Sequence, residues 1–156
     1  MPIVQVQPVY QPEVRALCCK PYPGHPKGCP NFGHAERCPP HAPLLPEVFD
    51  LKREVFAIYN RFDLGAHVAK MRNAHPDWGE RQLVCCLYWQ GTARGQLAKE
   101  IARITRAWPE KGWTILHTPE ACGVNITATM AAIGVRLQWP PQDYTYQIAL
   151  VGVTRS

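Results

Sequence analysis

Short runs of apolar residues, separated by polar stretches, recur along the chain from residue 47 onward. Runs of this length with little internal alternation are typical of buried strands. The pattern therefore predicts strands at 55–59, 83–89, 113–117 and 147–153, and an edge strand within 3–10.

A second spacing, with an apolar residue at every third or fourth position, predicts helices. It is clearest over 92–108, where charged residues occupy the opposite face. A helix over 64–74 is predicted with Asp63 as its N-cap. A weaker helix over 125–133 is predicted to end at Gly134, since glycine commonly terminates helices.

Strands that alternate with helices indicate crossover connections, which join parallel strands. We therefore predict an α/β fold with a small mixed or parallel sheet, flanking helices and an irregular Pro- and Cys-rich N-terminal segment. The length of 156 residues fits a single domain over 1–156. In parallel sheets, sites form beyond the carboxyl ends of the strands, so we expect the site there.

Residues 8–46 differ in composition from the α/β body over 47–156. They contain ten of the sixteen prolines and four of the seven cysteines. Proline at this density is predicted to exclude helices and central strands. Such a segment cannot pair its own backbone hydrogen-bonding groups, so it needs another interaction to hold it in one conformation. A bound metal is a candidate for that interaction.

The overall composition narrows the class of protein. Apolar residues make up 46% and charged residues 19%, as in globular proteins. No apolar run approaches about 18 residues, and the N-terminus lacks the features of a signal peptide, so we expect no membrane span and a cytoplasmic location. In that reducing compartment, clustered cysteines bind metal or do chemistry more often than they form disulfides.

Several function classes lack support. The net charge is +5, but no run of Lys or Arg accompanies it, so nucleic acid is not an expected partner. The chain contains no phosphate-binding loop and no dinucleotide-binding fingerprint. No sequence motif therefore supports nucleotide hydrolysis or hydride transfer as the activity of this chain.

The principal candidate site is a set of cysteines in the Pro-rich segment. Nine residues separate Cys19 from Cys29, and eight separate Cys29 from Cys38. These are not the spacings of zinc ribbons or of bacterial ferredoxins. Thiolates on rigid loops nevertheless suit both iron–sulfur clusters and zinc. We interpret one of Cys18 and Cys19 as a ligand, and favour Cys19.

The identity of the fourth ligand decides the chemistry. Cys122 is the candidate, because it precedes a predicted helix whose N-terminus would favour the thiolate. Cys19, Cys29, Cys38 and Cys122 would then hold a [4Fe–4S] cluster suited to electron transfer or to a structural role. If Cys122 lies elsewhere, one iron would be open to a substrate and would act as a Lewis acid.

The histidines of the Pro-rich segment and the remaining cysteines allow other interpretations of the site. His25, His34 and His41 lie in the same segment, so a mixed Cys/His zinc site is an alternative to the cluster. Cys85 and Cys86 lie in an apolar run, and we interpret them as packing residues.

Three further residues are candidates for binding an anion or substrate. Thr92 and Arg94 open the long predicted helix, where free backbone N–H groups attract an anion and Arg94 would add a bidentate partner. Thr92 acting only as an N-cap explains the same pattern. His117 ends a predicted strand, so it faces either the site or the core.

Two stretches, 29–34 (CPNFGH) and 38–43 (CPPHAP), resemble a family of uncharacterised bacterial and archaeal proteins described as predicted metal-binding. A later pair, 119–123 (PEACG) and 130–135 (MAAIGV), resembles the C-terminal part of that family. The resemblance implies metal binding but no particular reaction. That family usually has several cysteines in this part, whereas this chain has only Cys122, so we expect one centre at most.

Three hypotheses follow. The first is a small iron–sulfur protein whose cluster serves a redox partner or activates a small-molecule substrate near Arg94 and His117. The second is a zinc-stapled, non-enzymatic interaction module. The third is an α/β enzyme whose cysteines are incidental.

Overall fold

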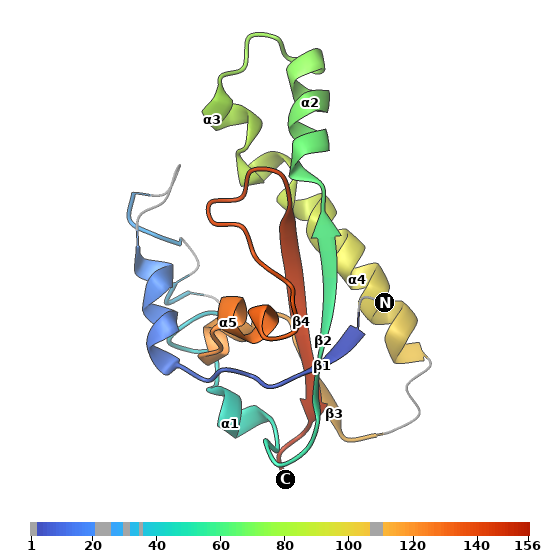
Figure 1. Cartoon of the computed structure of the whole chain (residues 1–156). Coiled ribbons are helices and arrows are strands. Elements are labelled where there is room, and N and C mark those ends of the chain that lie inside the picture. The colour runs from blue at the N-terminus through green and yellow to red at the C-terminus, as the bar shows by residue number, and fades with distance from the viewer. Residues whose placement is uncertain (1–2, 21–25, 30–31, 35, 107–110) are drawn as a thin grey trace.

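A computed structural model of the chain describes residues 3–20, 26–29, 32–34, 36–106 and 111–156 (Figure 1). Four strands form one sheet in the order β1-β2-β4-β3, and every neighbouring pair is antiparallel. The strands are β1 (Ile3–Val6), β2 (Val55–Phe62), β3 (Trp113–Leu116) and β4 (Thr145–Val153).

The prediction of an α/β fold is confirmed, but the prediction of parallel pairing is wrong. β4, the last strand of the chain, lies between β2 and β3 and runs against both of them. β2 and β3 consequently point in the same direction without being neighbours. The carboxyl ends of these two strands therefore still lead toward one end of the sheet.

The two faces of the sheet bury different sets of side chains, because successive residues of a strand point to opposite faces. On one face, Ile58 and Val151 pack against the apolar side of α4 (Gln90–Arg106). On the other, Ala57 and Leu150 pack against α5 (Ile126–Ala131). The sheet is thus covered on both faces, as Figure 1 shows.

One helix begins directly after its predicted capping residue. Asp63 accepts a hydrogen bond from the backbone N–H of Ala66 at 2.9 Å and opens α2 (Leu64–Ala74). Asn125 caps α5 in the same way, through the N–H of Ala128 at 3.0 Å. A short helix, α1 (Leu45–Val48), precedes β2, and two 3₁₀ helices lie at η2 (Cys86–Tyr88) and η3 (Pro119–Cys122).

The predicted strand over 83–89 is wrong. The run forms the end of α3 (Glu80–Leu83) and then η2. Its large side chains do not share one environment, since Leu87 is 79% exposed whereas Trp89 is buried and stacks on Phe62 with ring centroids 5.5 Å apart. The indole N–H of Trp89 donates to the carbonyl of Val84, which closes the turn.

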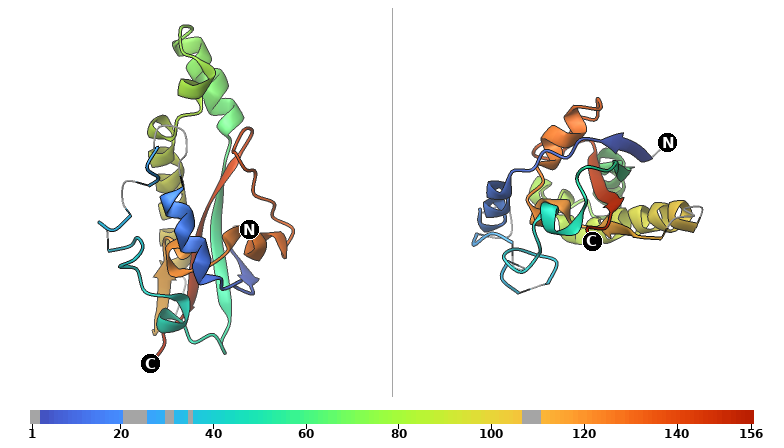
Figure 2. Two further views of the ribbon diagram at one scale, coloured as in Figure 1. Left: turned by 90° about the vertical axis from the view of Figure 1, so that its left-hand side faces the viewer. Right: turned by 90° about the horizontal axis from the view of Figure 1, so that it is seen from below.

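The helices α2 and α3 with η2 form a hairpin that extends beyond the end of the sheet (Figures 1 and 2). The cluster that joins this hairpin to the body contains Phe62, Leu64, Trp89 and Ala93, with Cys86 packed against it. None of the helices in the described part of the chain is long and apolar enough to span a membrane.

The Pro-rich segment contains a helix that the sequence analysis excluded. η1 (Pro12–Cys19) begins with a proline at its first turn, where the missing N–H is tolerated, and contains no further proline. The chain before η1 is joined to the body by backbone hydrogen bonds from Gln11 to Gly123 at 2.7 Å and from Asn125 to Val9 at 2.8 Å. η1 consequently lies alongside η3 (Figure 2).

Candidate functional site

Three thiols of the Pro-rich segment influence one another electrostatically. Burial raises the pKa of Cys18, and the proximity of Cys29 and Cys38 raises it further. Burial and the proximity of Cys29 likewise raise the pKa of Cys38. All seven cysteines are free thiols. We refer to Cys18, Cys29 and Cys38 as the thiol trio.

The backbone holds two members of the trio side by side. The N–H of Cys29 donates to the carbonyl oxygen of Cys18 at 2.7 Å. Gly28 has a φ of +86°, and a Cβ at this position would lie 2.5 Å from the same carbonyl oxygen. Only glycine fits this contact without displacement of η1, so the approach of Cys29 to Cys18 depends on residue 28.

The third member, Cys38, begins a tight turn. Its carbonyl oxygen accepts hydrogen bonds from the N–H groups of His41 and Ala42, both at 3.0 Å. The Nε2 of His41 lies 2.9 Å from the carbonyl oxygen of Gly33, to which it donates when protonated. These contacts fix the turn that follows Cys38.

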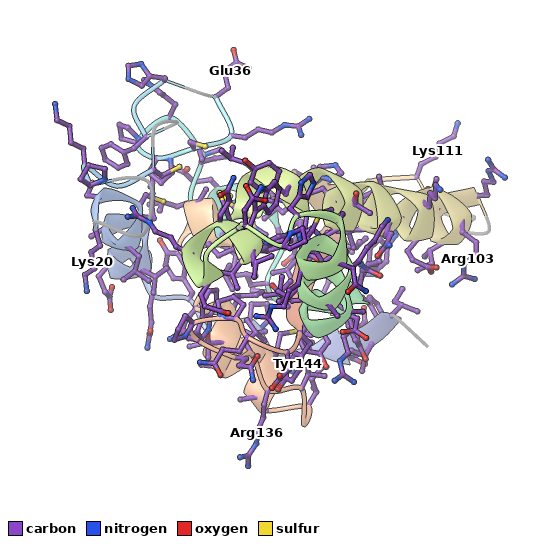
Figure 3. The ribbon with its side chains drawn as sticks, turned by 90° about the horizontal axis from the view of Figure 1, so that it is seen from above. Lys20, Glu36, Arg103, Lys111, Arg136 and Tyr144 are labelled. Atoms are coloured by element: carbon purple, nitrogen blue, oxygen red, sulfur yellow. The ribbon has the colours of Figure 1, made fainter. Side chains whose placement is uncertain are left out.

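In Figure 3, sulfur atoms gather between η1, which leads to Lys20, and the loop that carries Glu36. Arg103 and Lys111 mark the opposite side of the molecule in that view.

The structure distinguishes Cys18 from Cys19. Cys18 is partly buried, and its thiol interacts with both Cys29 and Cys38. Cys19, the ligand that we favoured from the sequence, is exposed. The geometry of the segment therefore favours Cys18 as the partner of Cys29 and Cys38.

Cys122 lies beneath the Cys38 turn. It is 3% exposed and packs with Ala42 and Ala121. Burial raises its pKa to about 11, with Glu120 adding to the effect and Arg15 opposing it. A buried thiol held in its neutral form packs as a small apolar side chain. Cys122 is thus close to the trio through Ala42, but its own surroundings are apolar.

Whether these residues fit a metal centre depends on donor chemistry and on arrangement. Thiolates are suitable ligands for zinc and for iron–sulfur clusters. Within the described ranges, no group of three or more His, Cys, Asp or Glu side chains is arranged so that it could hold a metal ion as it stands. The donor types of the trio therefore fit such a centre, whereas a complete coordination shell is not formed. His25, one of the alternative ligands, lies outside these ranges.

The predicted anion-binding residues Thr92 and Arg94 lie near the start of α4. The helix begins at Gln90, so Thr92 lies inside it and is not the N-cap. Arg94 is exposed. Its positive charge lowers the pKa of Cys38 and of Glu120, against the larger effect of burial on both. The charge of Arg94 therefore reaches Cys38, one member of the thiol trio.

His117 is exposed at the end of β3, close to the same loops. Burial of its ring lowers its pKa, and the charge of Arg37 lowers it further. The hydroxyl of the next residue, Thr118, donates to the carbonyl oxygen of Arg37 at 3.0 Å. This hydrogen bond ties the loop after β3 to the residue before Cys38.

Sequence reasoning missed Glu120, which influences both Cys18 and Cys122. The residue is exposed to solvent, yet the surrounding protein desolvates its carboxyl group and raises its pKa. Its position two residues before Cys122 was the available signal.

Arg37 and Arg15 were also missed. Arg37 directly precedes Cys38, and Arg15 lies one helical turn before Cys18 in η1. The guanidinium of Arg15 donates to the carbonyl oxygen of Ala42 at 3.2 Å, so η1 is hydrogen-bonded to the Cys38 turn. Both arginines therefore belong to the surroundings of the trio.

Comparison with family models, with curated proteins and with solved structures found no match for this chain. Function is therefore inferred from the residues themselves. Three thiols, one desolvated carboxyl group and several arginines belong to η1, η3, the Cys38 turn and the start of α4, and their charges act on one another.

Proposed function

We propose that the chain binds an iron–sulfur cluster through the thiolates of Cys18, Cys29 and Cys38. The observation that carries this proposal is the mutual influence of three thiols from separate positions in one Pro-rich segment. Three like groups destabilise one another as thiolates unless a cation neutralises them, and a metal centre supplies that cation. The resemblance of residues 29–34 and 38–43 to a predicted metal-binding family supports the same proposal.

Four protein thiolates normally hold a [4Fe–4S] cluster, so the fourth position needs an assignment. Cys122 is buried and packs with Ala42 of the Cys38 turn, but its surroundings favour the neutral form. We therefore propose that the fourth position is open to a small ligand. A cluster with an open iron supplies Lewis-acid chemistry to a bound substrate. Substrate activation is favoured on this ground over electron transfer alone.

Anaerobic purification tests the proposal. We expect a brown protein with iron and sulfide bound, and with visible absorbance from thiolate-to-iron charge transfer. Cys29→Ser and Cys38→Ser are each expected to abolish cluster retention. Cys85→Ser is the matched control, because Cys85 lies in the α3–η2 hairpin beyond the end of the sheet, and it should retain the full iron content.

Two further variants decide the ligand set. If the trio holds the cluster, Cys18→Ser loses it, whereas Cys19→Ser and Cys122→Ser retain it. If the single variant Cys122→Ser also loses the cluster, a closed four-thiolate site is favoured and the open position is contradicted. A colourless protein with no bound iron under anaerobic conditions would overturn the proposal.

A zinc site with a structural role is the second candidate. His41 lies in the same turn as Cys38, where its backbone N–H donates to the carbonyl oxygen of Cys38. Three cysteines and one histidine form a complete tetrahedral zinc site. In that case the purified protein is colourless with one equivalent of zinc, and His41→Ala lowers zinc retention. An iron–sulfur cluster held by cysteines alone predicts that His41→Ala is without effect.

A further inference from the structure

We propose that Cys18 and Cys29 form a reversible intramolecular disulfide by exchange with a small disulfide such as oxidised glutathione. Both thiols belong to the proposed ligand set, so the disulfide and the metal centre exclude each other. The exclusion of metal rests on the proposed function, whereas the formation of the disulfide rests only on the positions of the two cysteines.

The backbone brings these two cysteines together directly. The N–H of Cys29 donates to the carbonyl oxygen of Cys18 at 2.7 Å. Residues that share backbone hydrogen bonds across paired strands have Cα atoms about 5.5 Å apart, and disulfides join Cα atoms roughly 4.4–6.8 Å apart. A contact of this kind therefore brings two cysteines within the span of a disulfide.

Gly28 makes the close approach possible. An added Cβ at this residue would lie 2.5 Å from the carbonyl oxygen of Cys18 and 2.9 Å from the Cα of Cys19. The φ of +86° also favours glycine, because it has no Cβ. The absence of a side chain at residue 28 thus lets the peptide group of Cys29 reach the end of η1.

Cys38 lies in a separate turn. The N–H of Gly33 donates to the carbonyl oxygen of Pro39 at 2.7 Å, so this turn contacts the chain that follows Cys29. No backbone hydrogen bond among the described residues joins Cys38 directly to Cys18. The backbone therefore pairs Cys29 with Cys18 and leaves Cys38 outside the pair.

Accessibility alone predicts a different product. Cys19 is exposed, whereas Cys18 and Cys29 are both partly buried. Reaction governed by exposure would therefore involve Cys19 first. Burial and the proximity of Cys29 raise the pKa of Cys18, which agrees with two thiols that lie close together. The proposal thus predicts that proximity, and not exposure, selects the pair.

Oxidised glutathione supplies the oxidising equivalents through two exchange steps. The thiolate of one cysteine attacks a sulfur of glutathione disulfide, so that its S–S bond breaks and one glutathione thiolate leaves. The thiolate of the second cysteine attacks the protein sulfur of this mixed disulfide, so that the protein S–S bond forms and a second glutathione thiolate leaves. Two protein thiols are oxidised, one glutathione disulfide is reduced to two glutathione molecules, and the two thiol protons pass to the glutathione thiolates.

Equilibration of the full-length protein with oxidised glutathione, followed by alkylation of the remaining thiols and peptide mass mapping, tests the inference. We expect Cys18 linked to Cys29, with the seven thiols reduced in number by two and restored by dithiothreitol. A linkage of Cys19 to Cys29, a disulfide between two copies of the chain, or a mixed disulfide with glutathione as the final product would overturn the inference.

Single variants identify the pair. Cys18→Ser and Cys29→Ser should each abolish the intramolecular disulfide. Cys19→Ser is the matched control, because Cys19 is the neighbouring and more exposed thiol, and its rate of disulfide formation should stay within twofold of wild type. Gly28→Ala should slow disulfide formation tenfold or more, since it displaces Cys29 from Cys18. Equal rates in Cys18→Ser and Cys19→Ser would overturn the assignment.

Metal content separates this inference from the proposed function. In the metal-loaded protein, each disulfide formed should release one metal centre, and a disulfide that forms with the metal retained would overturn the exclusion. If the protein contains no metal but links Cys18 to Cys29, the proposed function fails and the disulfide stands. If the protein binds metal through the trio but forms no such disulfide after a chelator has removed the metal, the disulfide fails and the proposed function stands.

Discussion

Gly28 is the residue on which the arrangement of the thiols most directly depends. Its φ of +86° is unfavourable for any residue with a side chain, and an added Cβ would meet the backbone of Cys18 and Cys19 at less than 3 Å. We therefore predict that Gly28→Ala separates Cys29 from Cys18. The expected result is loss of metal retention with the overall fold intact, measured by metal analysis and circular dichroism.

Gly33→Ala provides the control for this prediction. Gly33 has a similar φ of +78°, but no atom lies within 4 Å of an added Cβ. The variant therefore carries only the left-handed backbone penalty of roughly 1–2 kcal/mol. It should retain more metal than Gly28→Ala. Equal metal retention in the two variants would contradict the role assigned to the Gly28 contact.

His67 provides a prediction about pH. Burial lowers its pKa and the charge of Lys70 lowers it further, while its Nε2 finds no hydrogen-bond partner among the residues that the structure describes. The folded chain therefore holds a neutral imidazole, whereas the unfolded chain takes up a proton below about pH 6.5. The stability contributed by this residue is present above that pH and is lost as the pH falls.

We expect the free energy of unfolding of the wild-type protein to decrease between about pH 8 and about pH 5.5. His67→Leu removes the titrating group and should show a shallower decrease over the same interval. Urea unfolding at several pH values measures both curves. Parallel curves for the two proteins would rule out His67 as a source of the pH dependence.

At the scale of elements, tertiary contacts decide the secondary structure of the run from Leu83 to Trp89. A strand would place Leu83, Leu87 and Trp89 on one face, because side chains alternate along a strand. The helical turns instead bury Leu83 and Trp89 and leave Leu87 79% exposed. We therefore predict that Leu87→Ser changes the free energy of unfolding by less than about 0.5 kcal/mol, as exposed positions do.

Leu83→Ser is the matched comparison. Leu83 is 1% exposed, and placing a hydroxyl in its position removes buried apolar contacts and leaves a cavity. A loss of about 2–5 kcal/mol is expected, by analogy with large-to-small replacements in cores. Chemical unfolding of both variants tests the assignment. A large loss from Leu87→Ser would restore the strand interpretation.

At the scale of the whole molecule, the Pro-rich segment is fastened to the sheet through α5. The hydroxyl of Thr129 is fully buried, accepts a hydrogen bond from the N–H of Val9 at 2.9 Å and donates to the carbonyl of Asn125 at 2.8 Å. Thr129→Val preserves shape but leaves the N–H of Val9 without this acceptor. We predict a loss of about 1–3 kcal/mol in the free energy of unfolding.

Thr127→Val serves as the control, because the hydroxyl of Thr127 accepts from the exposed indole of Trp139. Its effect should stay below about 1 kcal/mol, since water replaces the lost partner. Limited proteolysis provides a second measurement. The segment before η1 should be cleaved faster in Thr129→Val than in the wild-type protein, and equal cleavage rates would contradict the fastening role of Thr129.

Local signals in the sequence were sufficient for much of the body. Strand segments at 55–59, 113–117 and 147–153 were predicted from apolar runs, and the capping residue Asp63 from side-chain chemistry. These features depend on residues close together in the chain. The same reasoning failed for 83–89, where a continuous apolar run is compatible with strand or helix and only the neighbouring Phe62 and hairpin decide.

The cysteine-rich segment could be recognised from the sequence as the place of the candidate site, because its composition departs from that of the body. The sequence could not show which of these cysteines come together. Their proximity depends on the φ of Gly28 and on the packing of η1 against η3. Glu120 and Arg37 were not predicted for the same reason. They belong to loops whose positions are set by contacts over long sequence separations, such as that of Thr118 with Arg37.

The sequence by itself determined which side chains are available: four cysteines among prolines, a long amphipathic helix and a set of apolar strands. Only the tertiary structure decided the pairing of the strands, because β4 enters between β2 and β3 from the end of the chain. It likewise decided that Cys18 comes close enough to Cys29 and Cys38 for their charges to interact, and that the charge of Arg94 reaches Cys38. Composition and periodicity are local properties, whereas proximity depends on how distant segments pack.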